Sequence, residues 1–531
     1  MTEVEWQFDA DNASAVGKWL DGANIPGYTI QRGATKKLRD LYLDSADWRL
    51  QRAKLTCRVR AKGDGFELTM KSMAGSSGGL RRRREITEKL KTPGADGAPT
   101  DLALLAMLAP GPCGNAIRLI CGTRPLRDLF TIATHREIFI LGDGEGRLAE
   151  IAVDETRAIP ASDGDEAAED PPLQRVEVEV EGTLERAQRF VDVFVVANGL
   201  RPADVSKFEY AMRATTQHAP ANPPNLGQAL VTAEMTAGQA AYAILRKQFG
   251  VFLANEGGTR WGDDIEGLHD MRVSARRMRA AMSAFREYLP ATVERHRLEL
   301  GWIAAALGEV RDLDVQIERM AEWRDGLPES NAHALDSVEA LFVARRTAAR
   351  KRMLRALDSR RYDRFVERFS RFLRLGPPRT FGPGKQPIIE IAPVVVSKRY
   401  RQFRKQGDLI VPGSPPDDYH ALRILGKKLR YALEFVAPVY GEPLLDFSRG
   451  VTAIQDILGL HQDADVAVTM LEEMARTDGR RLGPEALMAM GGIAERYRIH
   501  AGELRGQTPA AYAKLKGKPW QTVQKLMAKR M

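Results

Sequence analysis

The second half of the chain carries two short rows of basic residues with the same spacing. In "HDMRVSARRMR" (269–279) a histidine and three arginines follow one another at intervals of three, four and three, and "HALRILGKKLR" (420–430) repeats the pattern 151 positions later. On an α-helix such positions fall within about 80° of arc, so each row makes one narrow cationic stripe. Concentrated like charge destabilises a fold unless an anion relieves it, so the stripes predict a ligand with many phosphates. The stripe residues are His269, Arg272, Arg276 and Arg279 in the first row and His420, Arg423, Lys427 and Arg430 in the second.

A second motif shares this offset. "LGEVRDLDV" (307–315) returns as "LGLHQDADV" (458–466), again 151 positions later. Two motifs with one offset predict two copies of a helical unit related by pseudo-symmetry. The aspartates of the motif are interpreted as structural, either capping helices or forming ion pairs that orient the arginines. They are Asp312, Asp314, Asp463 and Asp465. In the alternative interpretation, the stripes are solvated basic faces that pair with these aspartates.

The first half carries charged residues two apart in strand-like segments. Glu3 and Glu5 of "EVEWQF" share one face of a strand, because successive side chains alternate between faces. The same holds for a pair of arginines and a second pair of glutamates, which are Arg58 and Arg60, and Glu177 and Glu179. If the sheet closes with these faces inward, carboxylates would hold a divalent metal while arginines and lysines would hold phosphate oxygens. The alternative is the solvated face of an antiparallel sheet, which alternates in the same way.

Residues 1–212 are predicted to be mainly strands that form a closed or nearly closed antiparallel sheet. Two helices interrupt them, near 10–22 and 184–198. The expected strands lie at 3–8, 55–62, 65–72, 82–90, 137–141, 149–155 and 175–182. Loops rich in Gly, Pro or acidic residues are expected at 74–79, 91–99 and 161–172.

Beyond a Pro-rich linker at 213–225, apolar residues recur at helical spacing. The break "LGPPRTFGPGKQP" (375–387) divides the helical region, 226–505, into two repeats. These repeats are expected at about 226–375 and 388–505, and the basic stretch 506–531 is expected to be a loosely held tail. The predicted fold is therefore α+β and multidomain, with an antiparallel β-barrel over 1–212 followed by an all-α duplicated helical bundle.

Composition narrows the class of protein. The 44% hydrophobic and 28% charged residues are typical of a soluble globular protein, and the longest apolar runs are too short to span a bilayer. Three cysteines in 531 residues argue against a disulfide framework, and no apolar signal segment opens the chain, so a reducing cytoplasm is expected. Residues 1–212 hold 29 Lys and Arg against 33 Asp and Glu, whereas the remainder holds 50 against 37. This asymmetry indicates that the second half meets a polyanion.

The helical region resembles the CHAD domain, the conserved histidine α-helical domain. "LHDMRVSARRMRAAMSAF", "LGEVRDLDV", "HALRILGKKLRYALEF" and "LGLHQDADV" carry the resemblance, which extends over about residues 228–505. It implies a duplicated helical bundle with a basic groove that binds inorganic polyphosphate. It also assigns polyphosphate contact to the eight stripe residues.

Residues 1–212 resemble the CYTH, or triphosphate tunnel metalloenzyme, family. The E-x-E strand at Glu3 and Glu5, "LYLDSADWRLQRAKLTCRVR", "LTMKS", "EVEVEG" and "SKFEYAMR" carry this resemblance. With the helical region behind it, the whole chain resembles the bacterial CYTH–CHAD inorganic triphosphatases. The resemblance implies a β-barrel tunnel in which Mg²⁺ or Mn²⁺ bridges triphosphate and glutamates while water attacks a terminal phosphorus.

The same resemblance implies roles for individual residues. The metal ligands would be Glu3, Glu5, Glu177 and Glu179. The substrate-binding residues would be Arg58, Arg60, Lys71, Arg84, Arg136 and Lys207. The catalytic group would comprise Glu3, Glu5, Lys71 and Arg136.

One position departs from the family pattern. The family opens with E-x-E-x-K, and here Gln7 stands in place of the lysine. A glutamine side chain supplies hydrogen bonds but no charge. The expected function is metal-dependent hydrolysis of inorganic triphosphate in the tunnel, with polyphosphate bound by the helical domain. The alternative is a non-catalytic protein with a degenerate tunnel that binds polyphosphate or its granules. The expected partners are inorganic triphosphate and polyphosphate, with no membrane and no specific nucleic acid.

Overall fold

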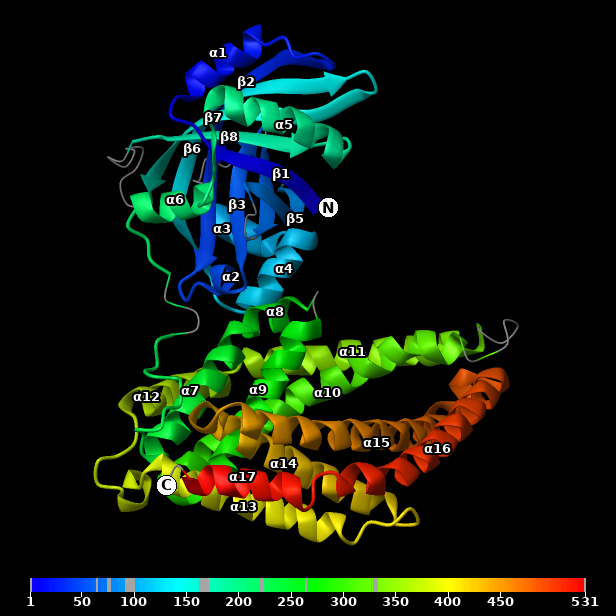
Figure 1. Ribbon diagram of the computed structural model, residues 1–531. Coiled ribbons are helices and arrows are strands. Elements are labelled where there is room, and N and C mark those ends of the chain that lie inside the picture. The colour runs from blue at the N-terminus through cyan, green and yellow to red at the C-terminus, as the bar shows by residue number, and fades with distance from the viewer. Residues whose placement is uncertain are drawn as a thin grey trace. The chain divides into compact units, whose positions relative to one another are not determined.

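In the computed structural model the chain forms two compact units, residues 1–222 and 223–531, each described here by itself (Figure 1). The structure describes residues 2–63, 65–73, 78–90, 101–161, 171–219, 221, 224–262, 265–325, 327 and 333–529. The loops expected at 74–79, 91–99 and 161–172 lie mostly or wholly outside the described residues.

The first unit is a closed antiparallel barrel, as predicted. Its strands follow the order β5-β4-β3-β2-β6-β7-β8-β1, and β1 pairs back with β5 to close the sheet, while β9 adds to the edge of β1. The strands are β1 (Thr2–Asp9), β2 (Tyr28–Ser45), β3 (Leu55–Lys62), β4 (Gly65–Ser72), β5 (Leu80–Leu90), β6 (Leu126–Asp143), β7 (Gly146–Pro160), β8 (Leu173–Val180) and β9 (Arg201–Pro202). The seven expected strands are present, whereas the long β2 was not among them, because its middle section is polar and exposed.

The apolar faces of several barrel strands point outward rather than inward. Trp6 and Phe8 of β1 and Val178 of β8 are buried in a core with Phe190 and Phe194, which belong to a helix on the outside of the sheet. The helices of this unit are α1 (Ala13–Gly22), α2 (Arg49–Arg52), α3 (Leu102–Leu108), α4 (Pro112–Cys121), α5 (Leu184–Asn198) and α6 (Lys207–Ala214). Because side chains alternate along a strand, the charged face of β1 and β8 is turned into the barrel.

The second unit is helical throughout its regular structure within the described residues. Its helices are α7 (Ala237–Ala254), α8 (Glu256–Trp261), α9 (Ile265–Ala284), η1 (Arg286–Tyr288), α10 (Val293–Asp325), α11 (Asp336–Leu357), α12 (Arg360–Leu375), η3 (Gly382–Lys385), α13 (Ile388–Gly407), α14 (Pro416–Tyr440), α15 (Glu442–Leu482), α16 (Pro484–Ala513) and α17 (Lys518–Lys529). Helices α7 and α13 begin 151 residues apart, as do α9 and α14. The duplication read from two motifs therefore extends to the helices around them.

The two copies are not separate domains. Buried residues of both copies, among them Met278 of α9 and Leu429 of α14, belong to one hydrophobic core. A second core joins the far ends of α10 and α11 to those of α15 and α16, through residues such as Trp323 and Met490. The shared core fixes the mutual position of the two basic stripes.

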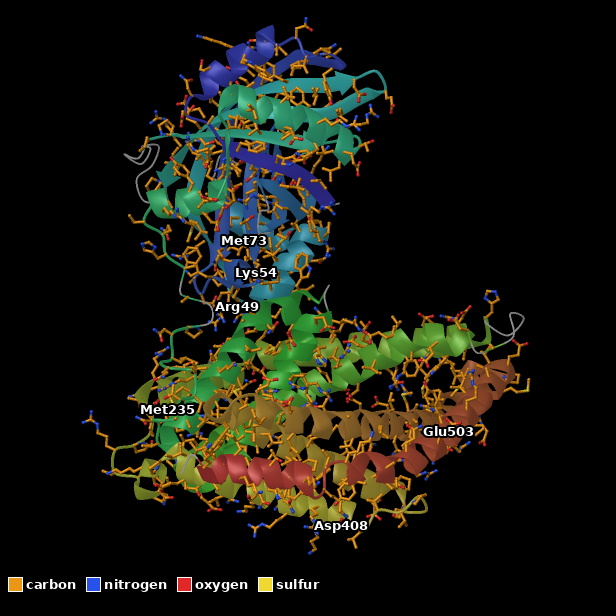
Figure 2. The ribbon with its side chains drawn as sticks, in the orientation of Figure 1. Arg49, Lys54, Met73, Met235, Asp408 and Glu503 are labelled. Atoms are coloured by element: carbon orange, nitrogen blue, oxygen red, sulfur yellow. The ribbon has the colours of Figure 1, made fainter. Side chains whose placement is uncertain are left out.

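The expectation of a loosely held tail over 506–531 is wrong for the described part. Helix α16 continues to residue 513, and α17 packs Trp520, Val523 and Met527 into the main core. The connection is fastened to the end of α13 by Asp408, labelled in Figure 2, which accepts from the Tyr512 hydroxyl at 2.8 Å and from Lys516 Nζ at 2.7 Å. The apolar residues at helical spacing outweigh the basic composition of this segment.

Within the described ranges, no single helix combines the length and apolar character needed to cross a membrane. The helices α3 and α4 meet the length and composition criteria only as a pair, with a bend of 98° between them.

The packing of α17 predicts a measurable stability effect. Trp520 is 8% exposed and its ring stacks on Tyr400 with a centroid separation of 3.7 Å. Trp520→Ala should lower the free energy of unfolding by about 3–5 kcal/mol, because it removes a buried aromatic side chain and leaves a cavity. Urea denaturation followed by circular dichroism measures the change.

Gln521→Ala, one position further and exposed, is the control and should leave the unfolding midpoint within about 0.5 kcal/mol of wild type. Equal midpoints for the Trp520 variant and the control would contradict the packing of α17.

Candidate functional site

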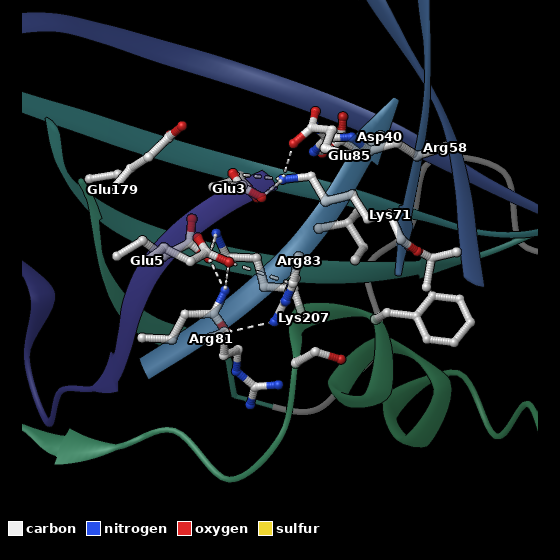
Figure 3. Close-up of a pocket in the computed structure, with 18 of the residues that line it drawn as sticks. Glu3, Glu5, Asp40, Arg58, Lys71, Arg81, Arg83, Glu85, Glu179 and Lys207 are labelled. Carbon is white, nitrogen blue, oxygen red and sulfur yellow. Dashed lines mark hydrogen bonds and ion pairs between the residues drawn. The ribbon is translucent and has the colours of Figure 1, made fainter. Parts of the chain in front are cut away.

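The barrel encloses a cavity of about 280 Å³ whose lining is mostly charged (Figure 3). Seven basic side chains line it, namely Arg58, Arg60, Lys71, Arg81, Arg83, Arg136 and Lys207. Eight acidic side chains line it, namely Glu3, Glu5, Asp40, Glu85, Glu150, Glu177, Glu179 and Glu209. The acidic and basic side chains nearly balance in number, so the cavity has little net charge although most of its lining is ionisable.

The structure brings together all the predicted tunnel residues except Arg84. Arg83 of β5 lies opposite Glu3 of β1, so alternation turns Arg81, Arg83 and Glu85 inward and places Arg84 on the other face. The expectation that Arg84 lies in the tunnel is thus wrong by one position, because Arg83 lines the cavity instead. The metal and substrate roles of the remaining residues stay predictions.

The acidic wall of the cavity is formed by β1 and β8. Glu5 lies opposite Glu179 and Gln7 lies opposite Glu177 in the strand register. Burial raises the pKa of Glu5 to about 7, with further contributions from the nearby carboxylates of Glu177 and Glu3. Glu5 is therefore partly protonated near neutral pH.

Gln7 is the hub of this wall. Its side-chain amide donates to Glu5 Oε1 at 3.0 Å and to Glu177 Oε1 at 3.1 Å. Its carbonyl oxygen accepts from Arg83 at 3.2 Å and from Arg175 at 3.4 Å. A neutral amide therefore holds two carboxylates at a position where a lysine would add a positive charge.

The basic wall is held by two aspartates that the sequence did not single out. Asp40 of β2 accepts from Arg60 at 2.7 Å, and Asp154 of β7 accepts from Arg136 at 2.8 Å and also contacts Lys207. Burial alone would raise the pKa of Asp40, but the guanidiniums of Arg58 and Arg60 outweigh it and lower the pKa. Asp40 therefore stays ionised, and both aspartates fix the direction of the cations. Both aspartates alternate along their strands with other inward-facing residues, and this alternation could have identified them from the sequence.

Two arginines of the cavity lining each hold one buried donor without a partner among the described residues. The Nε atoms of Arg58 and Arg83 are buried and have no hydrogen-bond partner within the part of the chain that the structure describes. A buried donor without a partner costs about 1–3 kcal/mol, so the arrangement is stabilised when an oxyanion accepts from it. Phosphate oxygens meet this requirement.

A divalent metal fits the acidic wall by chemistry rather than by ready-made geometry. Among the described residues, no group of three or more His, Cys, Asp or Glu side chains is arranged around a metal-sized point. Glu3 is instead bound to Lys71 Nζ at 2.8 Å, and Glu177 to Arg136 at 2.6 Å. All the candidate ligands are carboxylates, the donors that Mg²⁺ and Mn²⁺ prefer, and the raised pKa of Glu5 shows that added positive charge is favoured there.

In the helical unit, the two stripes meet across α9 and α14. Arg276 of α9 donates through Nε to the hydroxyl of Tyr431 on α14 at 2.9 Å. Burial lowers the pKa of Lys427 to about 7, and the cations Arg423, Arg276, Arg430 and Arg272 lower it further. Lys427 thus responds to charges from both helices, which places the two stripes in one electrostatic environment. We call the surface formed by the eight stripe residues of α9 and α14 the stripe groove. These residues are His269, Arg272, Arg276, Arg279, His420, Arg423, Lys427 and Arg430.

The repeated glycines explain how the arginines lie in the stripe groove. A Cβ atom at Gly308 would be 3.4 Å from Arg272 Nε, and one at the equivalent Gly459 would be 4.0 Å from Arg423 Nε. Asp312 accepts from Arg272 at 3.1 Å, which agrees with the interpretation of this aspartate as one that orients an arginine. The glycines leave room for each guanidinium against the neighbouring helix.

Not every stripe residue is equally available. Arg430 pairs with Glu434 at 3.4 Å, and Arg277 shares that carboxylate at 2.6 Å. His420 contacts Gln462 through Nδ1. Arg272, Arg276 and Arg279 of the first stripe line a cavity of about 240 Å³ on α9 and α10.

Comparison with known families agrees with this architecture. A model of the CYTH domain matches residues 1–210, and a model of the CHAD domain matches residues 243–472. The chain is therefore a protein with a CYTH domain followed by a CHAD domain, as the resemblances implied. No curated protein sequence matches the chain.

Several solved structures are similar to parts of the chain at low identity. A CHAD domain from the plant Ricinus communis is 24% identical, covering 59% of this chain and 97% of that chain at a TM-score of 0.42. PptA from Streptomyces chartreusis is 21% identical, covering 52% and 99% at a TM-score of 0.44. HpAC1 from Hippeastrum, described as a candidate adenylyl cyclase with a dominant triphosphatase activity, is 18% identical, covering 40% and 95% at a TM-score of 0.31.

The hub position of Gln7 generates a prediction about pH. The folded-state pKa of Glu5 lies above the ordinary value of 4.5, so the barrel should lose stability as pH rises from 5 to 8 in a chelator, by up to about 3 kcal/mol. Glu5→Gln should remove this loss, and Gln7→Lys should reduce it, because a cation beside Glu5 lowers its pKa. Urea denaturation at each pH measures the stability.

Glu145→Gln, an exposed change on the same unit, should retain the wild-type pH dependence. The interpretation fails if Glu5→Gln shows the same loss of stability between pH 5 and 8 as the wild-type protein.

Proposed function

We propose that the barrel hydrolyses inorganic triphosphate with Mg²⁺ or Mn²⁺, and that the helical domain binds inorganic polyphosphate. The observation that carries the first part is the cavity itself, where guanidinium and ammonium groups face a wall of glutamates. Such a lining suits a compact, highly charged anion bound together with a cation, and it offers few apolar contacts to any other ligand. The second part rests on the stripe groove.

The charge of the cavity supports a role for the metal. Because its acids equal or exceed its bases in number, the lining has no excess positive charge to offset a triphosphate. A divalent cation that enters with the substrate supplies that charge. When bound, it would also polarise a phosphoryl oxygen as a Lewis acid.

The residues of the chain divide the remaining work. Glu3, Glu5 and Glu179 would hold the cation. Arg58, Arg83 and Lys71 would grip phosphate oxygens and offset the charge that develops as water attacks the terminal phosphorus and the bridging P–O bond breaks. Asp40 and Asp154 would keep the basic wall in place without touching the substrate.

The direct test measures phosphate release from triphosphate, pyrophosphate and ATP, with and without Mg²⁺ or Mn²⁺. Preferential, metal-dependent release from triphosphate supports the proposal. The alternative, a non-catalytic polyphosphate-binding protein, is favoured by the neutral Gln7 at the hub of the acidic wall. No release with any divalent metal, combined with activity gained by Gln7→Lys, would establish that alternative.

The alternation of side chains along β5, which turns Arg83 inward and Arg84 outward, gives a more specific prediction. Arg83→Gln should lower kcat/KM for triphosphate by about 10²–10³-fold, because it removes a guanidinium from the site where charge develops. Arg84→Gln, one residue further and on the opposite face, should change kcat/KM by less than about threefold. Steady-state phosphate release measures both.

The pair is matched in residue type, strand and change of charge, so a general effect of lost charge would appear in both variants. Equal losses would mean that the inward face of β5 is not part of the active site.

The stripe groove gives a prediction about polyphosphate. Changing Arg272, Arg276, Arg423 and Lys427 to Ala should weaken binding of long-chain polyphosphate by at least about tenfold, because preorganised cations bind at little entropic cost. Fluorescence anisotropy or calorimetry at fixed salt measures the affinity. Wild-type affinity should also fall as pH rises from 6 to 9, since Lys427, with a pKa of about 7, loses its charge.

The control replaces four exposed lysines near the C-terminus, namely Lys514, Lys518, Lys525 and Lys529. Lys427→Arg should flatten the pH dependence, because a guanidinium stays charged. Equal losses from the two sets of four, or double-stranded DNA binding as tightly as polyphosphate, would reduce the stripe groove to a generic basic surface.

A further inference from the structure

Helix α12 carries a third basic row outside the stripe groove. Its members follow one another at intervals of three, four and three, the same spacing as in the two stripes. They are Arg361, Arg364, Arg368 and Arg371. The equivalent positions 151 residues later hold no cation, because they are Tyr512, Leu515, Pro519 and Thr522. The row is therefore not a by-product of the duplication.

The packing of α12 fixes the direction of this row. Tyr362, Phe365, Phe369 and Leu373 occupy one side of the helix and are buried in the main core. The four arginines span about 80° on another side, where all four are exposed. The aromatic core thus holds the row in one orientation.

A cavity of about 200 Å³ opens between this row and α10. It is lined by Arg295, His296 and Glu299 of α10 and by Arg361, Arg364, Phe365 and Arg368 of α12. Glu299, the one carboxylate in the lining, is bound to Arg361 at 2.7 Å. We call this cavity the arginine pocket.

Three arginines of the arginine pocket have no carboxylate partner within the described residues. Arg295 and Arg368 make no ion pair there, and Arg364 donates only to the backbone oxygen of Arg360 at 3.1 Å. Glu367 of α12 falls about 40° outside the row. The floor adds no compensating charge, because His296 lies against Phe369 and Phe372, and burial together with Arg295 lowers its pKa to about 4.

We propose that the arginine pocket and the α12 row bind a chain of inorganic phosphate groups, as a second polyphosphate contact on the helical domain. This inference rests on the proposed function of that domain. Guanidiniums bind phosphate oxygens in paired hydrogen bonds, and an anion here relieves repulsion that the protein leaves uncompensated.

The aromatic residues argue for a phosphate chain rather than single-stranded nucleic acid. A protein that binds single strands offers exposed rings on which bases stack. Here Phe365 is 3% exposed, and Trp302 is covered by the guanidinium of Arg361, 4.2 Å from the ring centroid. The arginine pocket therefore suits phosphate groups and offers no exposed ring on which a base could stack among its described lining residues.

A second contact changes what the domain selects. A chain long enough to reach both the stripe groove and the arginine pocket binds them as linked sites, so its affinity exceeds that of either site alone. A short chain engages one site at a time. The helical domain should therefore discriminate by chain length.

The test uses the full chain and long-chain polyphosphate. Arg364→Gln, Arg368→Gln and Arg371→Gln together should weaken binding by about tenfold or more. They should also reduce the slope of log affinity against log salt by about 2, by analogy with phosphate contacts in nucleic acids. The matched control changes three exposed arginines of α15 to Gln, namely Arg476, Arg480 and Arg481, and should leave both values near wild type. Triphosphate hydrolysis should stay unchanged in both variants.

A second background separates this inference from the proposed function. In the variant that lacks Arg272, Arg276, Arg423 and Lys427, residual binding of polyphosphate should remain, and the three α12 changes should abolish it. If the groove variant keeps no residual binding, or keeps it regardless of the α12 changes, the inference is overturned while the stripe groove stands. Single-stranded DNA or polyglutamate bound as tightly as polyphosphate at the α12 row would also overturn it. A wild-type chain that binds no polyphosphate overturns both proposals.

Discussion

The pairing of β1 with both β8 and β5 is the constraint on which the barrel and its interior depend. An open sheet would leave the face of Glu3, Glu5 and Gln7 in water, where its charges would be solvated and ordinary. Closure of the barrel shields these side chains from bulk water and gathers charged side chains from its strands around one cavity. The price in desolvation is offset by fixed pairs such as Arg136 with Asp154, whose carboxylate is fully buried.

The helical domain treats charge in the opposite way. In the barrel, each cation on the basic wall has an aspartate or glutamate beside it. In the stripe groove and the arginine pocket, cations such as Lys427 and Arg368 face other cations. The charges of the barrel are thus nearly balanced, whereas the ion pairs of the helical domain, such as Arg430 with Glu434, leave part of its positive charge uncompensated. This difference underlies the two proposed functions, one for the barrel cavity and one for the basic surface of the helical domain.

Sequence patterns predicted the site residues well where strand alternation allowed only one choice of inward-facing side chains. Glu3 and Glu5 are separated by the apolar Val4 and followed by the apolar Trp6, so their shared face follows from strand geometry alone. Arg84 failed because it lies in a run of four arginines, in which every phase places a cation inward. Only the pairing of β5 with β1 decides between Arg83 and Arg84. Asp40 escaped notice because the middle of β2 is polar and resembles a loop.

The near-neutral lining of the cavity has a thermodynamic consequence. If the barrel binds triphosphate together with a divalent cation, as proposed, a lining without excess positive charge couples the occupancy of one to the occupancy of the other. Linkage requires that each raise the affinity for the other by the same factor. On that proposal, the barrel would respond to the product of the two concentrations rather than to either one.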